Sequence, residues 1–150
     1  MTTPTDLPFR LIISGTKFPL KKLSYLVHKL LEPFPKMVNS YVKDSWDLLR
    51  KLPETVQQGT EIISLDVKDL YTNNDLGFQA VEYYMDKFPE LAHHRLGKSF
   101  VLRSLQLLQE NILFEFNETI YSQENGCAMG KDYGPTWATL AVGYLEETKL

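Results

Sequence analysis

Apolar residues recur at helical spacing near the start of the chain. Between Pro19 and Leu31 they fall on one face of a predicted helix, while lysines lie on the other face. A second helix is predicted to begin at Asp44, a residue type that caps helix N-termini, and to end at Pro53. Its inward face is predicted to carry Trp46, Leu49 and Leu52. The lysines of the first helix are consistent with a solvated face or with contacts to a phosphate backbone.

The second half of the chain predicts further helices and a hairpin. A helix after Thr72 has an apolar face formed by Leu76, Ala80, Tyr83, Tyr84 and Phe88. The next helix covers residues 97–110, and its apolar positions are Val101, Leu105, Leu108 and Ile112. A last helix opens at Gly134-Pro135 and buries Ala138, Ala141, Val142 and Leu145. Between these helices, residues 113–123 alternate apolar and polar side chains around Asn117-Glu118, which predicts a β-hairpin.

The stretch EIISLDVKDLYT, residues 61–72, predicts a central strand with an aspartate at its end. Ile62, Ile63, Leu65 and Val67 favour β-structure and surround Asp66. A buried carboxylate requires a partner, so Asp66 is a candidate metal ligand. It is also consistent with a structural role, in which the carboxylate bonds the following backbone amides and starts a turn. Together these elements predict an α+β fold, with a small antiparallel sheet covered by helices on one face.

Composition narrows the class of protein. The 150 residues are 43% hydrophobic, which is typical of a globular domain, and the formal charge of −3 argues mildly against a dedicated nucleic-acid binder. A single cysteine, Cys127, cannot form an internal disulfide. No apolar run is long enough to span a membrane, and no signal peptide is visible. We therefore expect an intracellular protein without membrane contact, nuclear or cytoplasmic.

Two segments together resemble the reverse transcriptases, and within them the Penelope-like retroelement branch. SLDVKDLYTN, at 64–73, is similar to motif A of that family, and GCAMGKDYGPTWATLAVGYLE, at 126–146, is similar to motif B. Further matches are RLIISG at 10–15, SYVKD at 40–44 and FEFNETIYSQENG before motif B. The resemblance implies an incomplete polymerase palm, with a fingers-like helical part at about residues 1–58 and a palm part at about residues 59–150.

The resemblance also implies roles for single residues. Asp66 would be the catalytic carboxylate that binds Mg²⁺, and the backbone carbonyl of Val67 would join it as a second metal ligand. The triphosphate would meet the backbone amides of Asp69 and Leu70 and the side chain of Arg10. Tyr71 would lie under the sugar and exclude a ribose 2′-hydroxyl. Met129 and Gly130 would lie near the incoming base and the template.

A structural interpretation stands beside each of these roles. Tyr71 is also consistent with a core aromatic residue, and Met129 and Cys127 with core fillers. Arg10 is also consistent with a surface charge, and Lys68 and Asp69 with a solvated turn. The sequence departs from the family pattern at Lys131-Asp132, where serine or threonine followed by proline is usual, and at Thr139, where asparagine is usual. The extra acid would repel a triphosphate, and Lys131 would partly offset it.

The implied activity is RNA-directed DNA synthesis, in which deoxynucleotides are added to a DNA primer on an RNA template. The Tyr-x-Asp-Asp sequence of motif C does not occur in the 150 residues, and neither does a thumb. We therefore expect this chain to be inactive alone and to contact a missing C-terminal palm and thumb. The alternatives are a non-enzymatic module that binds nucleic acid or protein, and a degenerate remnant of a retrotransposon.

Overall fold

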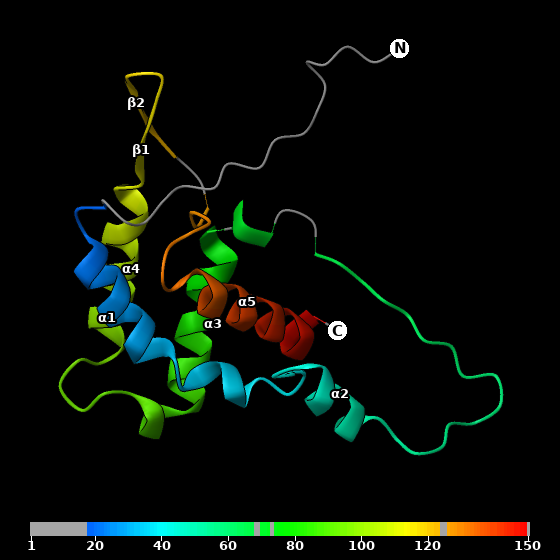
Figure 1. Ribbon diagram of the computed structural model, residues 1–150. Helices are drawn as coiled ribbons and strands as arrows, with labels where there is room; N and C mark the ends of the chain where they lie inside the picture. The colour runs from blue at the N-terminus through cyan, green and yellow to red at the C-terminus, as the bar shows by residue number, and fades with distance from the viewer. Residues whose placement is uncertain (1–17, 68–69, 73, 124–125, 150) are drawn as a thin grey trace, which may run out of the picture.

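The computed structural model describes residues 18–67, 70–72, 74–123 and 126–149. Within these residues the chain forms five α-helices and one two-stranded antiparallel sheet (Figure 1). The coarse prediction of an α+β fold is therefore confirmed. None of the helices in the described ranges is long and apolar enough to cross a membrane.

The first pair of packed helices is α1, Lys21–Leu31, and α4, Lys98–Glu110. On α1, Val27 and Leu31 are fully buried, as the spacing of apolar residues predicts. The predicted face of α4 is also buried; its members are Val101, Leu105 and Leu108, followed by Ile112 just beyond the helix. Amphipathic spacing thus identified both helices and their buried faces.

The centre of the molecule is the contact between α3, Asn74–Lys87, and α5, Gly134–Lys149. Tyr84 and Trp137 are buried here, and the 3-10 helix η2, Phe34–Met37, packs Phe34 against the same core. A further 3-10 turn, η4, covers Pro89–Leu91. One hydrophobic cluster contains residues from both sides of position 58, from Phe18 to Ala141. The predicted fingers-like and palm parts therefore share one core.

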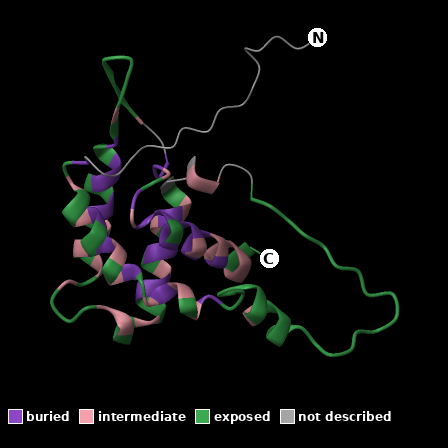
Figure 2. Cartoon of the chain, viewed as in Figure 1, coloured by how far each residue is buried: buried purple, intermediate pink, exposed green. Residues whose placement is uncertain are grey.

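The hairpin consists of β1, Leu113–Phe116, and β2, Thr119–Ser122, with Phe116 opposite Thr119. Asn117 and Glu118 both have positive φ, 50° and 60°, which is the conformation of a two-residue type I′ turn. The predicted hairpin is thus confirmed. Its side chains are nearly all exposed (Figure 2), so the predicted cover of helices over this sheet is wrong.

The short helix α2, Ser45–Lys51, begins where the sequence predicts. The carboxylate of Asp44 accepts a hydrogen bond from the backbone amide of Asp47 at 2.9 Å and caps the helix. The predicted inward face is wrong, because Trp46, Leu49 and Leu52 are 72%, 59% and 50% exposed. Helical spacing placed these residues on one side of α2 but could not show that anything packs there.

The predicted central strand does not form in residues 61–67. This segment has no regular secondary structure, and Figure 1 shows it as part of an extended loop beside the helices. Ile62, Ile63 and Leu65 are 95%, 75% and 87% exposed. A strand needs hydrogen-bonding neighbours to be stable, and no other segment of the described chain pairs with this one.

A polar cluster ties the end of α5 to α3. The hydroxyls of Tyr83 and Tyr84 donate hydrogen bonds to the Glu147 carboxylate at 2.8 and 3.0 Å, and the Lys87 ammonium pairs with it. Burial alone would raise the pKa of Glu147, but these hydrogen bonds and the charge of Lys87 outweigh burial and lower it. The cluster therefore stabilises the charged carboxylate in the folded state.

We predict that Glu147→Gln lowers the free energy of unfolding by about 1–2 kcal/mol at pH 7, because charge-assisted hydrogen bonds become neutral ones. A carboxyl with a lowered folded pKa stabilises the fold above its unfolded pKa, about 4.3, and that contribution is lost as pH falls through the folded pKa. Urea unfolding should show the difference between the two proteins at pH 7 and its disappearance in acid. A difference that persists at low pH would contradict this account.

Candidate functional site

The structure brings Tyr71 into contact with the glycine-rich turn at residues 126–134. The backbone amide of Cys127 donates a hydrogen bond to the Tyr71 carbonyl at 2.6 Å. The Tyr71 ring also lies beside Gly134, where an added Cβ would be 3.7 Å from its Cε1 atom. These two segments are far apart in the sequence, and they are the two that carry the resemblance. Their contact defines the candidate site.

The turn itself uses glycine where backbone geometry requires it. Gly126 and Gly130 have φ of 86° and 101°, a region that side-chain-bearing residues rarely adopt. A hydrogen bond from the Gly134 amide to the Lys131 carbonyl, 3.1 Å long, leads into α5. Gly130 is exposed and Met129 is half-buried beside it. Backbone at Gly130 is therefore open to close approach by a ligand.

Leu70 and Tyr71 begin the 3-10 turn η3, Leu70–Thr72, and both pack partly buried against the main core. Burial raises the pKa of the Tyr71 hydroxyl, and the nearby Cys127 adds to that rise. The packing of Tyr71 agrees with its interpretation as a core aromatic residue, and its role under a sugar stays a prediction. The Tyr71 ring also lies at the turn.

The structure does not bring Asp66 and Val67 to this contact as parts of a strand. Both lie exposed in the 61–67 segment, so the prediction that Asp66 ends a buried strand is wrong. Arg10 and Asp69 lie outside the described residues. The candidate site therefore contains Leu70, Tyr71, Met129 and Gly130 of the predicted set.

The described residues do not bring together a group of side chains that would hold a magnesium ion. No group of three or more histidine, cysteine or carboxylate side chains in these ranges is placed to hold a metal ion. Asp66 is exposed and belongs to no such group among the described residues. We therefore assign no step to Mg²⁺ here. The role of Asp66 and Val67 as metal ligands stays a prediction.

The burial of Lys131, within the turn, was not predicted from sequence. Lys131 is only 4% exposed, and its ammonium lies 3.4 Å from the centroid of the Phe18 ring. Among the described residues this ammonium has no hydrogen-bond partner. Burial raises the pKa of the neighbouring Cys127 thiol to about 11, although Tyr133 and Lys131 oppose that rise. Nothing in the local sequence marks Lys131 as buried.

Asp132 has a structural partner. The Ser24 hydroxyl of α1 donates a hydrogen bond to its carboxylate at 3.0 Å, and Ser24 is 1% exposed. This bond fixes the turn to α1. Asp132, one of the residues that depart from the motif B pattern, is thus held against α1 by this bond.

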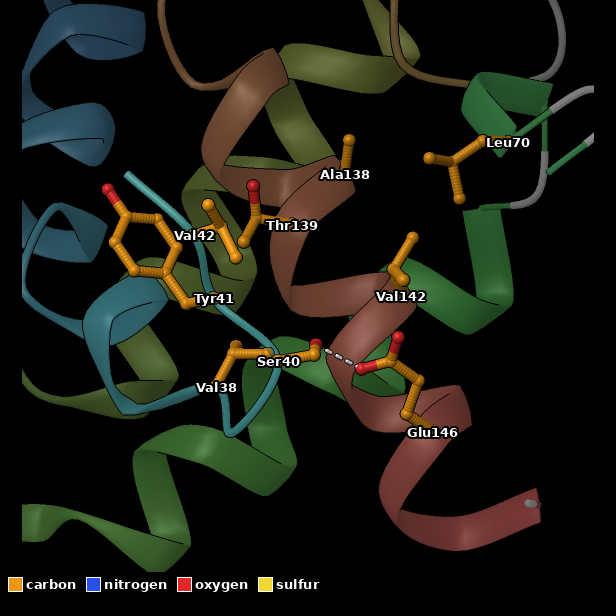
Figure 3. A pocket seen from close by; sticks show the side chains of 9 residues that line it. All are labelled: Val38, Ser40, Tyr41, Val42, Leu70, Ala138, Thr139, Val142 and Glu146. Carbon is orange, nitrogen blue, oxygen red and sulfur yellow. Dashed lines mark hydrogen bonds between the residues drawn. The ribbon is translucent and has the colours of Figure 1, made fainter. Parts of the chain in front are cut away.

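A groove lies between α5, the segment that precedes α2, and Leu70 of η3. It has a volume of about 400 Å³, and its lining is Val38, Ser40, Tyr41, Val42, Leu70, Ala138, Thr139, Val142 and Glu146. Figure 3 shows Leu70 across from Ala138 and Val142, and a hydrogen bond from Ser40 to Glu146 at one end. The groove is mainly apolar and shares Leu70 with the candidate site.

Comparisons with known proteins do not assign the chain to a family. No model of a known protein family matches the chain, and no curated protein or solved structure matches it either.

Proposed function

We propose that this chain forms part of the nucleotide-binding side of a polymerase of the reverse transcriptase type. The single observation that supports the proposal is the contact between Tyr71 and the 126–134 turn, with the Cys127 amide bonded to the Tyr71 carbonyl at 2.6 Å. The resemblance assigns both segments to one deoxynucleotide site. A chain in which they lay apart could not form that site.

The chemistry of the contact suits a sugar and base. An aromatic ring offers a flat face against a sugar, and it leaves little room for an additional hydroxyl. The open backbone at Gly130 permits close approach of a planar base. RNA template, DNA primer and deoxynucleotides are the partners that this function requires. Phosphoryl transfer would need further carboxylates, and Asp66 remains the proposed catalytic residue.

We predict that the purified chain binds dATP about tenfold more tightly than ATP, a difference of about 1.4 kcal/mol caused by exclusion of the 2′-hydroxyl. Tyr71→Ala should abolish that preference mainly by improving ATP binding, while Tyr71→Phe should keep it. Equilibrium dialysis with each nucleotide in magnesium buffer measures the affinities.

The matched control is Tyr121→Ala, which removes a half-exposed ring from the hairpin. It should leave both affinities unchanged. Equal affinity of the unaltered chain for dATP and ATP, or loss of preference in the Tyr71→Phe variant, would contradict the assigned role of the ring.

The second candidate function is a non-enzymatic module that binds another protein. The exposed apolar side chains of α2 favour it, because clusters of such residues commonly mark interaction surfaces. The nucleotide experiment separates the two functions. A folded chain that binds neither nucleotide would support the protein-binding module.

A further inference from the structure

The 61–67 segment exposes apolar side chains to an unusual degree. Ile63 and Leu65 are 75% and 87% exposed, and Val67 is 43% exposed. Figure 2 shows the whole segment as exposed, in contrast with the purple core of the helices. Burial of apolar side chains away from water is favourable, so covering this segment with another apolar surface would stabilise the protein.

The segment has an apolar face at the spacing of a strand. In an extended backbone, Ile63, Leu65 and Val67 point to one side, while Ile62, Ser64 and Asp66 point to the other. The first side is entirely aliphatic. The segment therefore fits a surface that is apolar, elongated and covered from one direction only.

The groove beside α5 is mainly apolar. Its walls include Val38, Tyr41 and Val142, and its polar groups Ser40 and Glu146 are bonded to each other at one end. Its volume of about 400 Å³ exceeds the ~150 Å³ of an apolar protein cavity that holds benzene, so it has room for more than one aliphatic side chain.

The chain connects the segment to the groove on both sides. Val42 lines the groove before α2, and Leu70 lines it shortly after Val67. A tethered segment meets its groove at an effective concentration in the millimolar range, which a second copy reaches only in concentrated solution. The chain's own segment is therefore the favoured occupant.

We propose that residues 61–67 act as a strap, which docks in this groove with Ile63, Leu65 and Val67 against α5. The structure has the strap open. Docking covers the apolar lining of the groove and leaves Ile62, Ser64 and Asp66 on the outer side. It does not require a nucleotide, so its test is independent of the nucleotide experiment.

The test uses a pair of cysteines in the full chain, Leu65→Cys with Val142→Cys. Under mild oxidation, an intramolecular disulfide should form at least about tenfold faster than in the control pair Ser64→Cys with Val142→Cys, because only position 65 faces the groove. Cys127 is 1% exposed and does not compete. Migration of the monomer in non-reducing gels reports the disulfide.

Each outcome decides the proposal. Equal rates for the two pairs would overturn it, and so would disulfide-linked dimers, which would make a second copy the occupant. Thermal unfolding gives a second reading: Leu65→Asp should lower Tm by about 3–6 °C, whereas Ser64→Asp should not. Unchanged Tm in the Leu65→Asp variant would also overturn docking, because it would show that the leucine stays in water.

Discussion

Replacing Gly77 with alanine is expected to lower the free energy of unfolding by about 3 kcal/mol, at the upper end of the usual cost of overpacking. The added Cβ would lie 1.9 Å from Cε2 and 2.0 Å from Cζ2 of Trp137. The Trp137 indole has little freedom to move. Trp137 is 1% exposed, and the Phe78 ring packs edge-on against the indole with 5.1 Å between the ring centroids. Urea unfolding followed by circular dichroism measures the loss.

A double-mutant cycle shows whether the indole causes this loss. In a Trp137→Leu background, Gly77→Ala should cost less than about 1 kcal/mol, so the two substitutions should be strongly non-additive. Gly97→Ala is the control, because nothing lies within 4 Å of its added Cβ. Additive costs of Gly77→Ala and Trp137→Leu would show that the two residues do not form the contact.

Local sequence was sufficient for most of the secondary structure. The helices α1 and α4 follow from apolar residues at helical spacing, and the Asn117-Glu118 turn marks the hairpin. Asp44 marks the start of α2. These signals act within a few residues of the chain, so a single sequence contains them.

Features that depend on distant partners could not be predicted in the same way. Composition favours a strand at 61–67, but a strand also needs a neighbour, and the described chain provides none. Likewise, spacing places Trp46 and Leu49 on one side of α2 without a surface to cover them. Local preference indicated what these segments can form, and tertiary contacts decided what they do form.

The candidate site also depends on contacts between distant segments, which local sequence does not reveal. The contact of Tyr71 with the 126–134 turn joins distant segments, and only the resemblance to a known family suggested it. The burial of Lys131 had no signal at all, because lysine is among the residues least often buried. Because this charge is buried, replacing Lys131 is expected to change the free energy of unfolding substantially.

We predict that Lys131→Met raises the free energy of unfolding by about 2 kcal/mol at pH 7. The ammonium is buried and has no hydrogen-bond partner among the described residues, so folding removes it from water without full compensation. Methionine has a similar shape and no charge, and it can still pack on the Phe18 ring. Loss of the cation–π attraction, about 1 kcal/mol, is included in this net value. Urea unfolding of both proteins checks it.

The stabilisation by Lys131→Met should shrink as pH rises. Burial lowers the pKa of Lys131, against the weaker opposing effects of Cys127 and Asp132. Between this lowered pKa and the unfolded value of about 10.4, the unfolded chain holds more protons at this site, so the unaltered protein gains stability with pH. The raised pKa of Cys127 lowers stability above about pH 8.5. Because the charge of Lys131 opposes that rise, Lys131→Met strengthens this loss in the variant, which also shrinks the difference between the two proteins. Lys21→Met, on the exposed side of α1, is the control and should show no such trend. If the difference between the Lys131→Met and unaltered proteins stays constant from pH 7 to pH 10, the ammonium has a compensating partner in the folded protein.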